Sequence, residues 1–266
     1  MTVVTKEDIK FALKNLGIGS GDIVLIHSSM KSMGHVEGGP ETVIQAVLET
    51  VGNEGTLCMP TMVQRDFSNA YKNWDINKSP SDVGYLTEYF RTRKGSLRSD
   101  QATHAVSAVG KMAEYIISEH TAYGPRLGEF GDYAFSKSSP WQRLYELNAK
   151  LLFIGVPMKK GTIRHLAEHI IVEKLIEKFP DATPEVRQYN EPLDKFWAEI
   201  DGDKVQVKYE ETGLLTKTTI GDAAVLCASA TPFVDEMIKL SIQSPLDYMG
   251  GMATSHPKFI ECIKQL

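Results

Sequence analysis

Three short apolar runs constrain the fold of this chain more than any other feature. They cover residues 22–27, 55–59 and 150–156, and their apolar residues follow one another instead of alternating with polar ones. Such runs are typical of strands buried on both faces, as in parallel sheets covered by helices. Between the first two runs, a helical repeat of apolar residues extends from Pro40 to Val51, and proline suits a first helical position. An α/β fold is therefore expected.

Further helices and a long loop are expected around these strands. Thr5 and Asp8 predict a capping box at the start of an N-terminal helix. Residues 64–80 are polar and aromatic without a period, which predicts a long surface loop, and residues 105–109 resemble a short strand. Helical patterns cover residues 83–93, 111–118, 141–147 and 163–178.

The pattern changes after Pro180. Alternation predicts antiparallel strands, and an amphipathic helix is expected over residues 232–242. The expected strands cover residues 196–200, 204–209 and 215–220. We find no internal repeat and no linker, so residues 1–266 are expected to form a single domain with an appended antiparallel portion.

Composition narrows the class of protein. The formal net charge of −5, from 29 basic and 34 acidic residues, argues against nucleic acid as the main partner. No apolar run approaches the ~18 residues that a membrane-spanning helix needs, so no membrane partner is expected. The three cysteines, Cys58, Cys227 and Cys262, are widely separated and odd in number, as expected of thiols in a reducing compartment. We therefore predict a cytoplasmic location.

The first candidate site follows the first apolar strand. His27, Ser28, Ser29 and Met30 begin a polar loop there, and loops at the carboxyl ends of strands are where open α/β sheets bind ligands. Hydroxyls and backbone N–H groups in such a loop can hold phosphate. A polar turn without a ligand is the alternative.

The second candidate site extends from Arg98 and Ser99 through His104 to Ser107. The guanidinium of Arg98 can pair bidentately with phosphate. For His104, a ligand contact and a structural role inside the fold are both open.

The third candidate site is the string from His165 to His169, which includes Glu168. Residues three and four apart share a helix face, so His165 can lie beside the other two. In one interpretation, Glu168 orients His165, which acts as a general base. In another, H-x-x-E-H is a zinc-peptidase signature in which both histidines bind the metal, with a downstream ligand such as Glu236. An amphipathic helix with incidental polar residues is the third possibility.

Taken in order, these stretches resemble the aminoglycoside 3-N-acetyltransferase family. The resemblance covers most of the chain and rests on residues 22–30, 38–39, 54–61, 98–104, 107–110, 138–140, 151–155 and 162–168. It implies a three-layer α/β/α fold around a mixed sheet, acetyl-CoA as acetyl donor, and no metal. It also implies His165 as the catalytic base, supported by Glu168. The coenzyme channel implied by the resemblance is lined by His27, Ser28, Ser29, Met30, Arg98, Ser99, His104 and Ser107.

Three positions depart from the family pattern. Lys159 stands where relatives usually carry aspartate, Gly161 where they carry asparagine, and Ala105 where they carry proline. A lysine near the acceptor opposes a polycationic aminoglycoside and suits an acceptor that carries phosphate. The sequence therefore predicts an N-acetyltransferase that acts by direct attack on an amino sugar, nucleotide-linked or an aminoglycoside. The alternative is a zinc-dependent hydrolase, and the oligomeric state is open.

Overall fold

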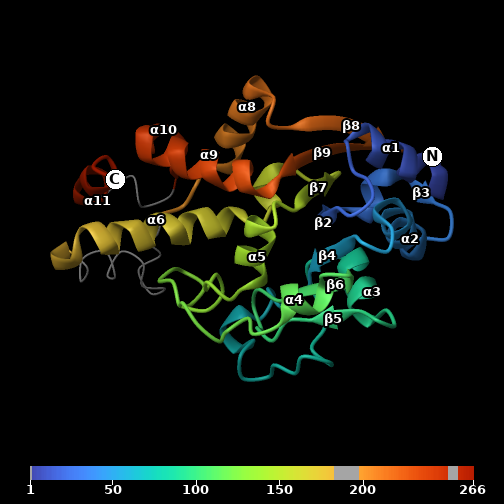
Figure 1. Ribbon diagram of the computed structural model, residues 1–266, viewed down its shortest axis with the longest axis horizontal. Coiled ribbons are helices and arrows are strands. Elements are labelled where there is room, and N and C mark those ends of the chain that lie inside the picture. Colours follow the sequence, from blue (N-terminus) through green and yellow to red (C-terminus); the bar gives the residue numbers. More distant parts are fainter. Residues whose placement is uncertain (1, 183–197, 251–256) are drawn as a thin grey trace.

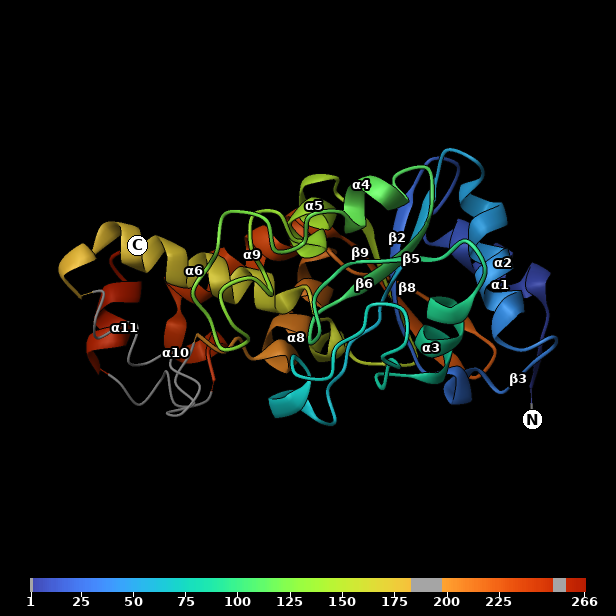
Figure 2. The same ribbon diagram turned by 90° about the horizontal axis from the view of Figure 1, so that it is seen from below.

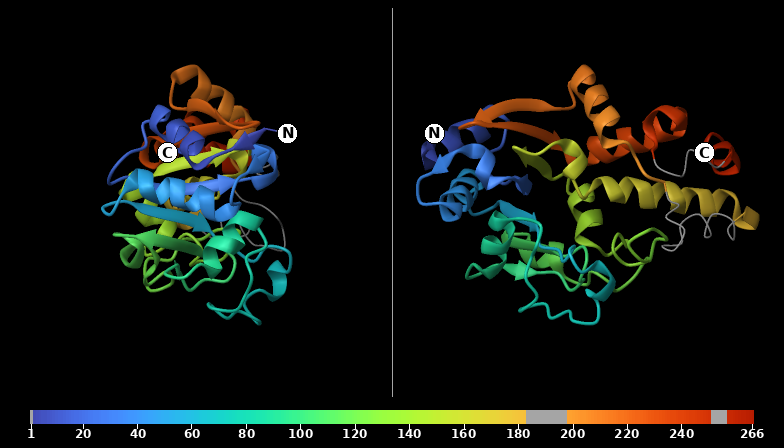
Figure 3. Two further views of the ribbon diagram at one scale, coloured as in Figure 1. Left: turned by 90° about the vertical axis from the view of Figure 1, so that its right-hand side faces the viewer. Right: turned by 180° about the vertical axis from the view of Figure 1, so that it is seen from behind.

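The computed structural model describes residues 2–182, 198–250 and 257–266. Its centre is a seven-stranded sheet in the order β5-β6-β4-β2-β7-β9-β8, whose strands lie one above another in the left view of Figure 3. The strands are β2 (Ile23–Ser28), β4 (Thr56–Pro60), β5 (Leu97–Arg98), β6 (Val106–Gly110), β7 (Lys150–Ile154), β8 (Thr216–Ile220) and β9 (Ala223–Ser229). Two short strands, β1 (Val3–Val4) and β3 (His35–Val36), pair in parallel beside it.

The three apolar runs form the middle of this sheet. Strand β2 pairs in parallel with β4 on one side and with β7 on the other. Antiparallel pairing extends the sheet on both sides. Strand β6 pairs with β4 and β5 pairs with β6, whereas β9 pairs with β7 and β8 pairs with β9. The carboxyl ends of β2, β4 and β7 therefore meet at one edge of a mixed sheet.

Helices cover both faces of the sheet. Figures 1 and 2 show α1 and α2 at the end near the N-terminus, and the long α6 beside α9 toward the other end. The helices are α1 (Lys6–Asn15), α2 (Pro40–Val51), α3 (Tyr85–Thr92), α4 (Ala113–Ile117), α5 (Pro140–Glu146), α6 (Arg164–Lys178), α8 (Gly202–Thr212), α9 (Ala230–Gln243), α10 (Pro245–Tyr248) and α11 (Pro257–Ile263). The predicted capping box of Thr5 and Asp8 is present, and Pro40 begins α2. None of the helices in the described residues is long and apolar enough to cross a membrane.

Alternate residues of the central strand belong to two different hydrophobic cores. On β2, Val24 and Ile26 pack into the core formed with α1 and α2, whereas Leu25 packs into the core formed with α5, α6 and α9. Successive side chains of a strand point to opposite faces, and each fully buried leucine or isoleucine contributes about 1.5–3 kcal/mol to folding. The fold therefore has three layers, α/β/α, as the resemblance implied.

The prediction of a strand over residues 204–209 was wrong, because these residues lie within helix α8. The side chain of Asp201 accepts the backbone N–H groups of Asp203 and Lys204 and caps this helix. Val205 and Tyr209, four residues apart, form its buried face. The alternation that suggested a strand is outweighed by this cap and by packing.

The other expectations for the last third had different outcomes. Of residues 215–220, Thr216–Ile220 form strand β8. Its partner β9 was not anticipated as a strand. Because β9 pairs with β7, the antiparallel portion continues the central sheet. Of residues 196–200, Phe196 and Trp197 lie outside the described residues, and Ile200 makes an isolated bridge with Met249. The expected final helix is α9.

Candidate active site

A cavity of about 540 Å³ opens at the carboxyl ends of the three central strands. Strand β2 contributes His27 and Ser28, and Met62 and Gln64 follow β4. Six residues that follow β7 also line the cavity: Val156, Lys159, Lys160, Gly161, Thr162 and His165. Other segments contribute Val83, Thr87, His104 and Phe130. Its volume is within the range of small-molecule sites, and ligands of open α/β sheets bind at this kind of edge. The cavity is therefore the candidate active site.

His165 lies in the first turn of α6 and lines this cavity. Its Nδ1 is 2.5 Å from Oε2 of Glu168, one turn further along the same helix face. Glu168 is fully buried, and its Oε1 accepts the backbone N–H of Ile200 at 2.8 Å and Nη1 of Arg164 at 3.2 Å. A carboxylate held from the scaffold side thus fixes the orientation of an imidazole at the cavity wall.

Burial controls the ionisation of both groups. It lowers the pKa of His165 well below the ordinary value, with a smaller contribution in the same direction from Arg164. Burial also raises the pKa of Glu168 to about 8, while Arg164 and the N–H of Ile200 oppose that shift. The imidazole of His165 is therefore neutral at pH 7, the form that can accept a proton. Arg164 and the N–H of Ile200 favour the carboxylate form of Glu168, which is the form whose Oε2 accepts Nδ1–H of His165.

His27 supports the segment that carries His165. Its Nε2 accepts the backbone N–H of Thr162 at 3.1 Å, and its ring stacks on Phe153 with centroids 5.5 Å apart. Burial lowers the pKa of His27 to about 4, so the ring is neutral and its proton lies on Nδ1. His27 lines the cavity, but its accepting nitrogen is used to hold the chain between β7 and α6.

The residues that follow His27 divide between the cavity and the scaffold. Ser28 lines the cavity, whereas Ser29 and Met30 are not among its lining residues. The N–H of Ser29 donates to the carbonyl of Ile154 at 2.9 Å. Met30 packs against the core on the α1 and α2 side. This loop therefore presents one hydroxyl side chain to the cavity.

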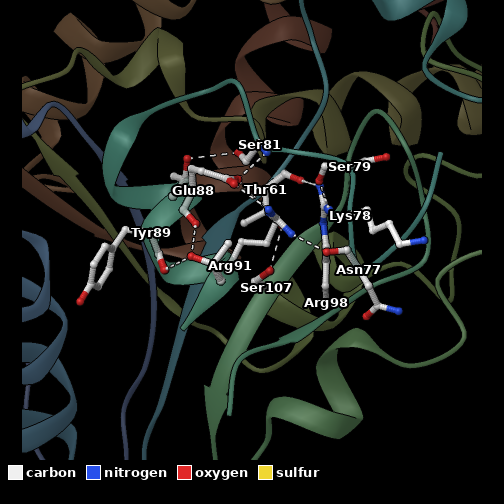
Figure 4. Close-up of polar contacts among 12 residues, drawn as sticks. Thr61, Asn77, Lys78, Ser79, Ser81, Glu88, Tyr89, Arg91, Arg98 and Ser107 are labelled. Carbon is white, nitrogen blue, oxygen red and sulfur yellow. Dashed lines mark hydrogen bonds and ion pairs between the residues drawn. The ribbon is translucent and has the colours of Figure 1, made fainter. Parts of the chain in front are cut away.

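Arg98 is buried in β5 and does not belong to the cavity lining. Figure 4 shows its polar contacts with the chain. Its guanidinium donates to the carbonyls of Ser79 at 2.6 Å and Ile76 at 3.2 Å, and also to the carbonyl of Thr61. Trp74 covers it at 4.3 Å from the ring centroid. Burial lowers its pKa to about 10, so it stays charged at pH 7. Arg98 ties the loop of residues 64–80 to the sheet.

The hydroxyls of Ser99 and Ser107 are also used inside the fold. Oγ of Ser99 accepts the N–H of Val106 at 3.0 Å and lies 2.9 Å from Nδ1 of His120. Oγ of Ser107 lies 3.0 Å from Oγ1 of Thr61. Both serines are fully buried and absent from the cavity lining. Of this second candidate group, the structure brings only His104 to the cavity.

The charged side chains of the lining are lysines. Lys159 and Lys160 line the cavity, and Nζ of Lys159 lies 2.8 Å from Oδ2 of Asp203. No aspartate or glutamate belongs to the lining formed by the described residues. The wall is therefore positive or neutral, and the pairing with Asp203 weakens the charge of Lys159.

The geometry does not favour the zinc-peptidase interpretation. Both oxygens of Glu168 are engaged, and Glu236 pairs with Lys239. The ring of His169 lies 4.8 Å from that of Phe135, and a Cβ at Gly128 would overlap it. Within the described ranges, no three histidine, cysteine, aspartate or glutamate side chains are grouped to hold a metal ion.

Sequence reasoning missed three residues that shape the site. Arg164 contacts Glu168, Thr162 binds His27, and the ring of Phe130 lies 4.7 Å from that of His165. The spacing of four between Arg164 and Glu168 was a usable signal, because such residues share a helix face. Phe130 comes from an aperiodic loop, and no local pattern placed it here.

Comparisons with known proteins show the family and the fold of this chain. The family model described as aminoglycoside 3-N-acetyltransferase matches residues 25–241. The Bacillus subtilis (strain 168) SPbeta prophage-derived aminoglycoside N(3')-acetyltransferase-like protein YokD is 32% identical over 195 residues, covering 65% of this chain and 68% of the relative. Aminoglycoside N(3)-acetyltransferase IX of Micromonospora chalcea is 29% identical over 182 residues, 62% of each protein. The match thus spans less than two thirds of that relative.

Solved structures show the same fold. The apoenzyme of aminoglycoside acetyltransferase AAC(3)-IVa superposes with a TM-score of 0.73 at 24% identity, covering 98% of this chain and 97% of the other. AAC-IIIb, solved as a binary complex with CoASH, gives 0.69 at 20% identity, covering 90% and 96%. The family match begins within β2 and continues through α6, which carries His165 and Glu168. The chain belongs to the aminoglycoside 3-N-acetyltransferase family, a family of acyltransferases.

Proposed function

We propose that this protein transfers the acetyl group of acetyl-CoA to an amino group of a small amino sugar, with His165 as general base. The observation that carries the proposal is the 2.5 Å contact between Nδ1 of His165 and the buried Glu168, at the wall of the 540 Å³ cavity. Membership of the family and the CoASH complex of AAC-IIIb support the choice of donor.

The chemistry requires one proton transfer in each direction. The amine nitrogen attacks the thioester carbonyl, a C–N bond forms, and His165 takes a proton from the amine. Because Nδ1 of His165 is hydrogen-bonded to Glu168, we propose that the proton of the amine moves to Nε2 of His165. The C–S bond then breaks, and the imidazolium returns the proton to the leaving thiolate. A positioned base of this kind typically contributes ~10²–10⁴-fold to the rate.

We propose that Glu168 acts through His165. It holds Nδ1–H and so directs the other ring nitrogen to the acceptor, while Arg164 and the N–H of Ile200 fix the carboxylate. The side chains of His27 and Ser28, at the end of β2, are proposed to contact the coenzyme. A cytoplasmic location is proposed from the three free cysteine thiols, Cys58, Cys227 and Cys262.

For the acceptor, we propose an amino sugar that carries an anionic group, such as a nucleotide-linked one. Lys159 and Lys160 line the cavity, and the described lining contains no carboxylate to bind the several ammonium groups of an aminoglycoside. The anionic coenzyme also suits two lysines, so the acceptor must be tested directly. The pair between Lys159 and Asp203 leaves Lys160 as the stronger local charge.

The test is a thiol-release assay with acetyl-CoA. Acceptors are UDP-glucosamine, sisomicin, gentamicin and apramycin, and a Lys160→Ala variant is compared with the wild type. Thiol release with UDP-glucosamine, weakened in the variant, supports both the activity and the acceptor class. Release with the aminoglycosides alone keeps the acetyltransferase and rejects the anionic acceptor. Failure of the wild type to bind acetyl-CoA, measured by calorimetry, contradicts the proposed function.

A further inference from the structure

A second histidine, His104, lies beside His165 at the cavity. The two ring centroids are 6.5 Å apart, with ring planes at 87°, and both residues line the cavity. His104 is 2% exposed and comes from the segment just before β6. Its Nδ1 lies 2.9 Å from Oγ1 of Thr103, so Nε2 is the ring nitrogen that can meet a ligand in the cavity.

A group of hydrogen bonds on the Nδ1 side of His104 favours one position for the ring proton. The backbone N–H of His104 donates to the side-chain oxygen of Gln101. The side-chain NH₂ group of Gln101 therefore points the other way, and it donates to Tyr71 OH at 2.6 Å and to Oγ1 of Thr103 at 3.2 Å. Oγ1 of Thr103 also lies 3.4 Å from Oε1 of Gln101 and 3.2 Å from Tyr71 OH. Its contact with Nδ1 of His104, at 2.9 Å, is the shortest of the three, so we assign the hydroxyl proton of Thr103 to that contact. An imidazole that accepts at Nδ1 carries its N–H at Nε2.

The surroundings keep this ring neutral and immobile. Phe130 and Phe135 lie against it, with centroids 4.5 Å and 4.9 Å away. The backbone carbonyl of His104 accepts Nε1–H of Trp141 at 2.9 Å. Burial, and then the neighbouring histidines, lower the pKa of His104 well below the ordinary value. A neutral N–H donor fixed in an apolar setting needs no reorganisation when negative charge develops near it.

We propose that Nε2–H of His104 donates a hydrogen bond to the thioester oxygen of acetyl-CoA as that oxygen becomes negative. This rests on the proposed function, in which His165 takes the proton of the attacking amine. The oxygen and the amine nitrogen are bonded to the same tetrahedral carbon, so their two partners must lie close together, as the rings of His104 and His165 do. When the C–S bond breaks, the oxygen returns to a carbonyl and His104 keeps its proton throughout.

The kinetic test compares His104→Asn and His104→Gln with the wild type. The loss of one such donor lowers kcat by about 10²–10³-fold. We expect this loss in His104→Asn, partial recovery in His104→Gln, whose amide N–H reaches further, and similar acetyl-CoA binding in all three. The matched control is His120→Asn, since His120 is another buried histidine and does not line the cavity.

A spectroscopic test reports on the hydrogen bond without an acceptor. Acetyl-CoA labelled with ¹³C at the thioester carbonyl is bound to each protein, and its carbonyl stretch is measured by infrared difference spectroscopy. A donor at the oxygen moves the band to lower wavenumber. We expect this shift in the wild type and in His120→Asn, its loss in His104→Asn, and a weaker shift in Thr103→Val, where the hydroxyl at Nδ1 is removed.

The outcomes separate the two proposals. If the wild type binds acetyl-CoA and the carbonyl band of His104→Asn equals that of the wild type, His104 is not the donor, whatever the effect on kcat. If the wild type does not bind acetyl-CoA, the proposed function itself fails. A band that shifts in the wild type and not in the His104→Asn variant supports the assignment, even when no acceptor of the panel is turned over.

Discussion

Arg98 and Glu168 are both buried ionisable residues close to the cavity, and their partners differ. Arg98 donates to the carbonyls of Thr61, Ile76 and Ser79, so its contacts are with the chain itself. Glu168 also has scaffold partners, but its second oxygen contacts an imidazole that lines the cavity. One region fixes a loop, and the other places a reactive group.

Arg98 and Glu168 differ in whether their hydrogen-bond partners can also interact with a ligand. A buried charge must be paired or hydrogen-bonded wherever it lies, so burial and polarity alone do not mark a site. The backbone carbonyls that accept hydrogen bonds from Arg98 have no group that could act on a ligand. The imidazole that pairs with Glu168 has a second nitrogen, so this charge can influence a ligand.

Replacing His165 should have the largest effect on turnover. We expect His165→Ala to lower kcat by about 10²–10⁴-fold, because the general base is lost, with acetyl-CoA affinity little changed. The measurement is thiol release together with calorimetric binding. His35→Ala, at an exposed histidine of β3, is the control and should match the wild type. Near-wild-type turnover of His165→Ala would remove His165 from the mechanism.

Replacing Glu168 should have a smaller effect on the same quantity. Glu168→Gln loses a hydrogen bond to a charged group, a contribution of about 1.5–3 kcal/mol, or roughly 10–150-fold in kcat. The affinity for acetyl-CoA should be retained. Thiol release measured beside His165→Ala gives the order of the two effects. A larger loss in Glu168→Gln than in His165→Ala would contradict a role through His165.

Replacing Arg98 should affect the loop more than the chemistry. We expect Arg98→Lys to lower the free energy of unfolding by about 1.5–3 kcal/mol, because charge-assisted hydrogen bonds to carbonyls are lost. Trypsin should cut the 64–80 loop faster, at Lys72 or Lys78. The ratio of affinities for acetyl-CoA and acetyl-pantetheine, which lacks the phosphates, should stay unchanged. A fall in that ratio would show that Arg98 binds phosphate after all.

The smallest expected effect is on the pH dependence of the free energy of unfolding, and it comes from His120 in the region of Arg98 and Ser99. Burial lowers the pKa of His120, which contacts Ser99, to about 4. The unfolded chain therefore binds a proton more readily below pH 6.5, and stability falls as the pH drops toward 4. From pH 7 to 5 this one group contributes a loss of about 2 kcal/mol. In urea unfolding, His120→Asn should show a pH-dependent loss smaller by that amount. An unchanged loss would contradict a buried neutral His120.

The sequence predicted the centre of the fold because local pattern and tertiary role coincide there. The runs that became β2, β4 and β7 are apolar because both faces are buried, and this can be read without knowing the partners. The strand predicted at 204–209 failed because Asp201 caps a helix whose buried face is set by distant packing. Strand β9 was missed because pairing with β7, over 70 residues away in sequence, defines it.

The site was predictable where it is local. His165 and Glu168 share one helix turn, so their contact could be expected from spacing. Arg98 was expected at the coenzyme because guanidinium suits phosphate, yet the chain supplies the carbonyls of residues 61, 76 and 79 around it. Sequence chemistry could not reveal that these acceptors fold back on it. The proximity of His104 and His165, 61 positions apart, also depends on the tertiary fold.

A double-mutant cycle on kcat tests the contrast between the two regions most directly. It uses His165→Asn, Glu168→Gln, Arg98→Lys and the two double variants that contain His165→Asn. If Glu168 acts through His165, Glu168→Gln should cause no further loss once His165 is replaced, whereas Arg98→Lys should have the same effect in both backgrounds. Independent effects of Glu168→Gln and His165→Asn, with full additivity, would contradict the account.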